Sequence, residues 1–309
     1  MTKLTPLLVR FSTLLVMLAL VAACTEAPAP IDPAYRAEVE QWRADRLEKL
    51  TAEDGWLSLT GLNWLTPGEN RFGSAPDSAV VLPDSSIPEI AGLLILGPNN
   101  TVAAHAAPGS GVQINGEPLA TASLRSDAEG EPDIITAGRI SFYIIDRDGR
   151  MGARVKDPQS PARAEFAGIE NFPVDEAYRV TARFESYQAP REVAIPTVLG
   201  QDTSMIATGL LRFTIDGCEQ TLEPYVESPD DERLFLIFRD PTSGDSTYGA
   251  GRFLSADAPG EDATTVLDFN RAYNPPCAFT PYATCPLPPP QNMLEVPIEA
   301  GEMYRGAAH

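Results

Sequence analysis

The sequence predicts a mainly β protein, with a short N-terminal helix, a first β-sandwich and a second β-rich domain of the barrel or sandwich type. Three observations support this prediction. Helical spacing of apolar residues is clear only near the N-terminus. The chain then consists of short apolar runs, and turn dipeptides such as Asp148-Gly149 and Asp216-Gly217 separate these runs. Regularly spaced short strands with such turns are typical of sandwiches and barrels.

The N-terminus has a positive start and an uncharged run. Lys3 and Arg10 precede thirteen uncharged residues, 11–23. This run is shorter than the roughly 20 residues of a spanning helix and fits the core of a secretory signal. It closes with Val-Ala-Ala before Cys24, which resembles a bacterial lipobox. The resemblance implies a signal peptide over 1–23, cleavage before Cys24 and acylation there by fatty acids such as palmitate. Thr25 favours the periplasmic face of the outer membrane within the cell envelope. An ordinary signal with an incidental Cys24 is the alternative.

Length and charge limit the partners. Removal of residues 1–23 from the 309 would leave 286, a length at which chains divide into domains. The remaining 21 basic and 43 acidic residues give a net charge of −22. Such a surface repels nucleic acid and anionic headgroups. We therefore expect no nucleic-acid partner, a monomer, and membrane attachment only through lipid on Cys24.

Composition and spacing predict the order of elements. Residues 24–33 are rich in Pro and Ala and form a tether. Apolar Val39, Trp42, Leu47 and Leu50 recur at helical spacing, which predicts a helix over about 33–52. This helix and a β-sandwich form a domain over 34–160, and a second β domain follows over 161–305. Hairpins are expected over 139–155 and 213–222, where an Asp-Gly pair separates two β-rich runs.

Residues 57–119 contain a further pattern, in which LSLTGLNWLTPGENRFGSAPDSAVVLPD is followed, after a gap, by GSGVQINGEPL. The pattern resembles the forkhead-associated (FHA) β-sandwich, although a generic sandwich with convergent turns would also produce it. The resemblance implies the fold but not the phosphothreonine site. Ser74 stands where that family has an arginine after the glycine, and IPEIAG (87–92) replaces its Ser-Arg-x-His segment.

Four longer segments carry a second resemblance: GWLSLTGLNWLTPGENRFG, YRVTARFE, LFLIFRDPTSGDSTYGAGRFL and LDFNRAYNPPCAFTPYATCPLPPPQNMLEVPIEAGE. Together they resemble the family DUF1684, which has no assigned activity, and they extend between Trp42 and Tyr304. The resemblance implies no reaction. It does imply that the segment rich in Cys and Pro is built into the fold.

Residues that commonly perform catalysis are scarce. His105 and His309 are the two histidines of the sequence. A Ser-His-Asp relay needs a histidine held between the nucleophile and the carboxylate, and no Gly-x-Ser-x-Gly elbow accompanies His105. We therefore name no catalytic residue. Two histidines also exclude a His-rich zinc site, and the sequence has no nucleotide-binding glycine loop. We expect no metal and no cofactor.

Polar side chains that could bind a ligand gather in the second domain. The candidates are Arg239, Tyr248, Arg252, Asp268, Asn270, Tyr273 and Asn274. Strand alternation places Asp268 and Asn270 on one face. Arg252 on a neighbouring strand could meet Asp268 there and bind an anionic ligand bidentately. The alternative is a buried ion pair that positions the Pro-rich segment.

The segment NPPCAFTPYATCPLPPPQN, residues 274–292, contains seven prolines and two cysteines. We expect an ordered, largely buried strap, followed by a final strand through Leu294, Val296 and Ile298. Export permits a Cys277–Cys285 disulfide, and so short a loop would gain about 2–3 kcal/mol. Free buried thiols and a metal or redox pair are the alternatives, and Cys218 is left over.

These observations favour a membrane-anchored envelope lipoprotein that acts as a binding or scaffold module for a small anionic ligand or a peptide. The first alternative is a hydrolase that uses carboxylates or Cys277 of the second domain. The second alternative is a purely structural lipoprotein.

Overall fold

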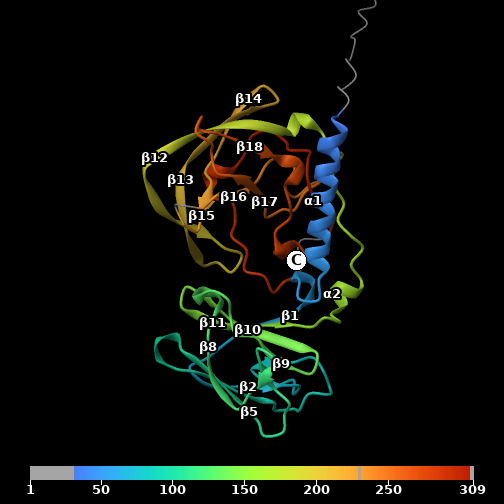
Figure 1. Cartoon of the computed structure of the whole chain (residues 1–309), viewed down its shortest axis with the longest axis vertical. Coiled ribbons are helices and arrows are strands. Elements are labelled where there is room, and N and C mark those ends of the chain that lie inside the picture. Colours follow the sequence, from blue (N-terminus) through green and yellow to red (C-terminus); the bar gives the residue numbers. More distant parts are fainter. Residues whose placement is uncertain (1–30, 229–230, 307–309) are drawn as a thin grey trace, which may run out of the picture. The chain divides into compact units, whose positions relative to one another are not determined.

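The computed structural model describes residues 31–228 and 231–306, and these belong to one compact unit that begins at Ile31. The expected signal peptide, Cys24 and His309 lie outside the described residues. The described part is mainly β, as the sequence predicts, and Figure 1 shows its elements. None of the helices in the described ranges is long and apolar enough to span a membrane.

Helix α1 (Pro33–Thr51) confirms the predicted helix. The Asp32 carboxylate accepts a hydrogen bond from the Ala34 amide at 3.0 Å, and Pro33 occupies the first turn, where it leaves no extra amide unpaired. Tyr35, Val39 and Leu50 are buried. Although the sequence groups α1 with residues 34–160, Tyr35 and Val39 pack in one cluster with Val174.

Residues 59–156 form the expected β-sandwich. In the described chain its first sheet has the strand order β1 (Leu59–Trp64), β11 (Arg150–Lys156), β10 (Ile140–Arg147), β9 (Ile135–Ala137), β6 (Gln113–Ile114) and β7 (Glu117–Pro118). The second sheet has the order β3 (Val80–Val81), β2 (Gly68–Gly73), β4 (Gly92–Leu96), β5 (Val102–Ala106) and β8 (Thr121–Leu124). One core lies between them, where the rings of Phe72 and Phe142 meet edge to face with centroids 5.3 Å apart.

A third sheet follows, with the order β17 (Arg252–Asp257), β16 (Arg233–Phe238), β15 (Tyr225–Val226), β13 (Asp202–Ile215), β12 (Arg179–Pro196) and β18 (Thr264–Asp268) in the described ranges. Strand β14 (Cys218–Leu222) pairs with β13 and forms the predicted hairpin. Asp216 and Gly217 at its turn have φ values of 49° and 72°, as a type I′ turn requires. The other predicted hairpin, β10–β11, has Asp148 and Gly149 at 52° and 80°.

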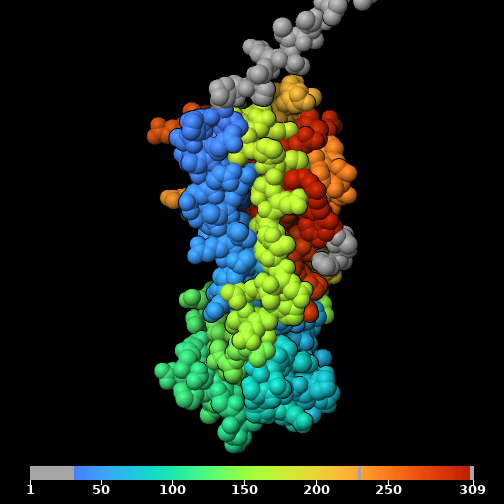
Figure 2. All heavy atoms as spheres, turned by 90° about the vertical axis from the view of Figure 1, so that its right-hand side faces the viewer, coloured from blue at the N-terminus to red at the C-terminus, as the bar shows by residue number. Residues whose placement is uncertain are grey.

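The remaining helical elements are short. Within the described ranges they are α2 (Pro161–Ala164) and 3₁₀ turns at Trp56–Ser58, Pro98–Asn100, Asp127–Glu129, Glu176–Tyr178, Phe269–Arg271, Pro276–Ala278 and Pro290–Asn292. Figure 2 shows that the segment between the sandwich and β12 passes between α1 and the C-terminal residues. Phe172 makes both connections: its carbonyl accepts from Arg43, and its amide donates to Gly301.

The strap prediction is confirmed. Residues 274–292 are ordered, and only Pro281, Pro290 and Gln291 among them are exposed. Cys277 and Cys285 form a disulfide, while Cys218 is free and exposed. The expected final strand is not formed. Leu294, Val296 and Ile298 are buried and alternate with exposed neighbours, but the described residues form no strand there. An isolated bridge joins Met293, just before this stretch, to Arg239, the residue after β16.

Candidate functional site

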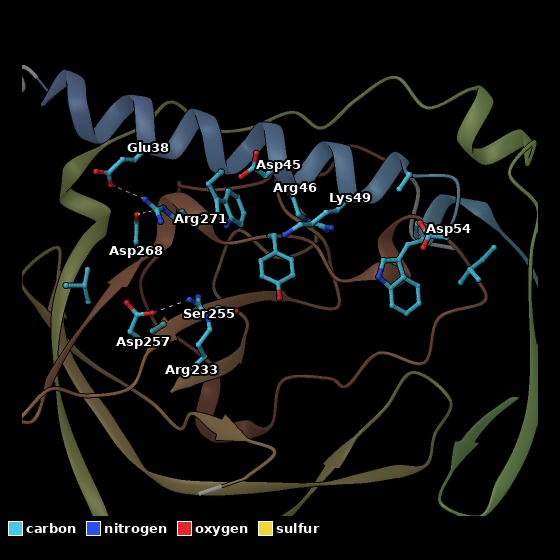
Figure 3. Close-up of a pocket in the computed structure, with 18 of the residues that line it drawn as sticks. Glu38, Asp45, Arg46, Lys49, Asp54, Arg233, Ser255, Asp257, Asp268 and Arg271 are labelled. Atoms are coloured by element: carbon cyan, nitrogen blue, oxygen red, sulfur yellow. Dashed lines mark hydrogen bonds and ion pairs between the residues drawn. The ribbon is translucent and has the colours of Figure 1, made fainter. Parts of the chain in front are cut away.

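A cleft of about 950 Å³ lies along one side of α1, and its lining comes from four parts of the chain (Figure 3). These parts are α1, the segment 52–59 that follows it, the β10–β11 hairpin, and the third sheet with the segment that follows β18. The lining residues are Glu38, Trp42, Asp45, Arg46, Lys49, Ala52, Asp54, Gly55, Trp56, Leu59, Tyr143, Lys156, Arg179, Arg233, Ser255, Ala256, Asp257, Val266, Asp268, Arg271 and Tyr273.

Helix α1 supplies one wall because of its side-chain spacing. Glu38, Trp42, Asp45 and Lys49 stand at i, i+4, i+7 and i+11, which places them on one face of a helix. The buried residues of α1 occupy the adjacent face. Figure 3 shows the labelled side chains of α1 on the side that faces Arg271 and Arg233. The helix is therefore anchored by one stripe and lines the cleft with another.

One end of the cleft contains a network in which charges are paired. Arg271 forms ion pairs with Asp268 at 3.1 Å and with Glu38 at 3.4 Å. The Tyr35 hydroxyl donates to Asp268 at 2.7 Å and accepts from the Asn270 amide at 2.9 Å. Burial, followed by the Asp268 hydrogen bond, raises the pKa of Tyr35. The network fastens the first turns of α1 to the end of β18.

The middle of the cleft is aromatic and leads to a buried ion pair. The rings of Trp42 and Tyr273 have centroids 6.2 Å apart, and the Arg46 guanidinium lies 5.0 Å from the Tyr273 ring centre. Arg46 pairs with Glu302 at 3.2 Å and donates to the Asn274 carbonyl at 3.0 Å. Burial raises the pKa of the Glu302 carboxyl. Arg46 is therefore held in place by groups behind the cleft wall.

The opposite end is named here the basic end. It is lined by Lys49, Asp54, Trp56, Tyr143 and Lys156, and Arg154, which lies behind this lining, is counted with it. The Lys156 ammonium donates to the Asp54 carbonyl at 2.6 Å and lies 5.3 Å from the Tyr143 ring centre. Burial lowers the pKa of Lys156, Asp54 opposes this shift and Arg154 adds to it. Lys49 makes no hydrogen bond or ion pair with any described residue, and a Cβ on Gly55 would lie 2.6 Å from its carbonyl oxygen. The end of α1 thus lies against the turn that leads to Trp56.

Arg154 lies behind two aromatic rings of the basic end. Its guanidinium is 5.3 Å from the Trp56 ring centre and 5.9 Å from that of Tyr143. It is 2% exposed, donates to the Tyr143 hydroxyl at 3.1 Å and to the Thr284 hydroxyl at 3.3 Å, and its Nε has no partner. Within the described chain no carboxylate forms an ion pair with it. Buried charges are normally paired, so Arg154 is an unusual feature of this wall.

The disulfide loop supports the basic end from outside. Thr284, next to Cys285, accepts hydrogen bonds from both Arg147 and Arg154. Phe279, inside the same loop, lies 5.8 Å from the Arg46 guanidinium. The strap therefore contacts Arg46, which lines the cleft, and Arg154, which lies behind it.

The structure distributes the predicted ligand-binding residues over several places. Asp268 and Tyr273 line the cleft, whereas Arg239, Tyr248, Arg252, Asn270 and Asn274 do not. The suggested contact between Arg252 and Asp268 is not formed. Arg252 is fully buried and pairs with Asp240 at 2.9 Å, and its guanidinium also donates to the carbonyls of Ile298 and Ala300.

The other candidates have structural contacts. Asn270 lies within the 3₁₀ turn after β18, which Asp268 caps, and its side-chain oxygen accepts from the Asp175 amide at 2.9 Å. The Asn274 side-chain amide donates to the Met303 carbonyl at 3.0 Å, and the Tyr248 hydroxyl donates to the Cys277 carbonyl at 3.2 Å. Arg239 exchanges backbone hydrogen bonds with Asn292 and Leu294. These contacts hold the strap and the C-terminal segment in place.

The sequence analysis missed five lining residues: Trp42, Lys49, Trp56, Tyr143 and Lys156. The composition of the chain contained a signal for four of them, the two lysines and the two tryptophans. The chain has three lysines and three tryptophans. Both lysines of the described part and two of the tryptophans line this cleft. Scarce residue types that converge at one place indicate a site, but their convergence is visible only in the fold.

Among residues 31–228 and 231–306, no group of three or more His, Cys, Asp or Glu side chains could hold a metal ion. Two cleft carboxylates, Asp257 and Asp268, form ion pairs with Arg233 and Arg271. The arrangement is suited to holding a ligand between aromatic and cationic groups, since the lining offers flat rings together with fixed polar groups.

Comparisons with known proteins agree with the second resemblance in the sequence. The family model "Protein of unknown function (DUF1684)" matches residues 164–303. An uncharacterized protein of Haloarcula marismortui, whose solution NMR structure is known, is 33% identical; the match covers 48% of this chain and 82% of that chain, with a TM-score of 0.41. An FHA domain studied for phosphothreonine-dependent interactions is 16% identical over 31% of this chain and 92% of that chain, with a TM-score of 0.22.

No curated protein matches the chain. The similarity to the FHA domain is too low to support an argument about ligand or fold. The family match and the haloarchaeal relative, which the chain covers over more than two thirds of its length, are sufficient for assignment. The chain belongs to the DUF1684 family of proteins of unknown function.

Proposed function

We propose that this protein is a binding module that holds a small anionic ligand in the cleft beside α1. The observation that supports the proposal is the set of lining cations that have no carboxylate partner among the described residues: Lys49, Lys156 and Arg179. The sequence has 43 carboxylates against 23 basic residues. Unpaired cations in so acidic a chain leave a local positive charge that a ligand could neutralise.

The size and lining of the cleft agree with this proposal. Its volume of about 950 Å³ lies at the upper end of the range for small-molecule sites. Trp42, Trp56, Tyr143 and Tyr273 provide flat apolar surface beside the cations. Aromatic rings with nearby cations bind ring compounds that carry a negative group.

We further propose that the module is a lipoprotein of the cell envelope, anchored through Cys24 on the periplasmic face of the outer membrane. The lipobox-like register of Val21-Ala22-Ala23-Cys24 supports this location. The strongly negative chain gives no other reason for attachment to an anionic surface.

Binding of 8-anilinonaphthalene-1-sulfonate, an aromatic anion, tests the ligand site by equilibrium dialysis. Ala52 lines the cleft directly after α1, so Ala52→Trp should fill it and reduce binding at least about tenfold. Ala44→Trp is the matched control, because Ala44 is exposed on the same helix and does not line the cleft. Equal binding to both variants would contradict the proposal.

A further inference from the structure

The charges of the basic end indicate the ligand class. Lys49, Arg154 and Lys156 contribute three positive charges, and the Asp54 carboxylate contributes one negative charge. No described carboxylate forms an ion pair with any of the three cations. The surplus is therefore two positive charges at one end of a cleft in a chain of net charge −20. The net charge of the protein cannot explain this surplus; only the local arrangement can.

Two of the three cations, Lys156 and Arg154, are held by their surroundings. Lys156 is fixed by the Asp54 carbonyl at 2.6 Å, and Arg154 by the hydroxyls of Tyr143 and Thr284. Arg154 and Lys156 alternate with Val155 on β11, so their side chains lie on the same face of the strand. Side chains that are already fixed before binding lose less conformational entropy when a ligand binds. The arrangement is that of a preorganised anion site.

A buried arginine supports this interpretation independently. Arg154 is 2% exposed, has no carboxylate partner within the described residues, and its Nε makes no hydrogen bond. A buried charge of this kind is costly unless a counter-charge is present. Attraction between charges is also stronger in a protein interior than in water. Arg154 does not line the cleft, and we assign to it a positioning and electrostatic role behind Trp56 and Tyr143.

We propose that the basic end binds the phosphate of a phosphomonoester that is carried on a ring, such as a nucleoside monophosphate or a sugar phosphate. A phosphomonoester has a charge of about −1.5 to −2 at pH 7 and three acceptor oxygens, which matches a surplus of two positive charges better than one carboxylate does. Trp56 and Tyr143 lie beside the cations as surfaces for the ring. This inference rests on the cleft being the binding site of the protein.

The test uses the full chain with Trp64→Phe, so that Trp42 and Trp56 alone report by fluorescence. Trp64 stacks under Arg150 outside the cleft. The probes are adenosine 5′-monophosphate, glucose 6-phosphate, adenosine and glucose. We expect each phosphate to bind at least about tenfold more tightly than its unphosphorylated partner. A larger gain for the nucleotide than for the sugar phosphate, lost in Trp56→Leu, would identify a nucleobase as the ring.

The variants separate this inference from the proposed function. Lys49→Gln and Lys156→Gln should each weaken binding of the phosphates about tenfold, and Lys156→Arg should retain it. Arg150→Gln is the charge-matched control, because Arg150 lies on β11 but does not line the cleft. Equal affinity for phosphates and neutral probes, or equal loss in Arg150→Gln and Lys156→Gln, would overturn the phosphate assignment. A failure of all four probes up to about 10 mM, with the aromatic sulfonate still bound in the cleft, would overturn only this inference. Equal binding of the aromatic sulfonate to Ala52→Trp and Ala44→Trp would instead overturn the proposed function.

Discussion

Replacement of Arg252 by methionine should destabilise the protein strongly while leaving the cleft intact. Arg252 is 0% exposed, and the Asp240 side chain that pairs with it at 2.9 Å is also 0% exposed. Arg252 additionally donates to the Ile298 and Ala300 carbonyls. Arg252→Met keeps much of the side-chain volume, but it leaves the Asp240 carboxylate without its counter-charge and the Ile298 and Ala300 carbonyls without the arginine as donor.

The expected magnitude follows from burial. Removal of one partner of a buried ion pair costs about 3–5 kcal/mol, since the other charge remains uncompensated. A protein of this size should then show a urea midpoint lower by about 1–2 M. Arg252→Met/Asp240→Asn removes both charges and should recover part of the loss. Arg71→Gln is the control, because its ion pair with Asp77 is exposed and contributes at most about 1 kcal/mol.

Urea unfolding followed by circular dichroism measures the midpoints, and dialysis with the aromatic sulfonate measures the cleft. Two results would refute the reasoning. The first is a free energy of unfolding for Arg252→Met within about 1 kcal/mol of the parent protein. The second is an unchanged midpoint together with lost binding, which is the behaviour of an arginine that contacts the ligand.

Three further predictions concern the strap, the basic end and the anchor. Cys277→Ser/Cys285→Ser should lower the free energy of unfolding by about 2–3 kcal/mol. It should also weaken sulfonate binding, because the loop positions Arg154 through Thr284. Urea unfolding with and without reductant measures the first effect, and a parent protein whose free energy of unfolding is the same after reduction would contradict it. Burial lowers the pKa of Lys156 below its ordinary value of 10.5. Because the protonated form attracts the anion, the affinity for glucose 6-phosphate should fall as the pH rises through that lowered pKa. Lys156→Arg should move this fall to higher pH, and an identical dependence of affinity on pH in both proteins would argue against the assignment. Cys24→Ala should abolish metabolic labelling with palmitate and release the protein from membranes, whereas labelling that survives the change would reject lipidation.

Local features of the fold could be predicted from the sequence because local interactions determine them. The Asp-Gly turns require positive φ values, and Asp216-Gly217 and Asp148-Gly149 have them. Apolar residues at helical spacing predicted α1 within one residue at its C-terminal end. The aromatic residues of 274–292 indicated a built-in strap, since disordered tails contain few aromatic residues.

The final strand was predicted wrongly for a reason that lies in distant side chains. Leu294, Val296 and Ile298 alternate as in a strand, and their burial alternates too. The backbone groups nevertheless bind side chains: the Glu295 amide donates to Gln220, and the Ile298 carbonyl accepts from Arg252. Pro297 has no amide to donate. Strand pairing was replaced by side-chain contacts that no local pattern reveals.

The candidate site was less predictable because its residues are distant in sequence. Lys49 and Lys156 are separated by most of the sandwich, yet both line one cleft. The sequence favoured Arg252 because it lies among polar neighbours, and the fold instead buries it against Asp240. Proximity along the chain is thus a weak guide to proximity in a β protein, where most contacts join distant segments.

An anionic ligand would stabilise the unpaired cations of the cleft and the buried Arg154 behind it. Carboxylates are abundant in this chain, with 43 against 23 basic residues, so a shortage of partners does not explain them. Asp45 stands one turn before Lys49 on α1, a spacing that permits an ion pair, and it accepts instead from Gln41 at 2.7 Å. The uncompensated charge of buried Arg154 carries a free-energy cost. An anion that fills the basic end would remove this cost, and binding to the folded state alone would stabilise the fold by RT ln(1 + [L]/Kd). The same residues would therefore bind the ligand and make the stability of the protein depend on it.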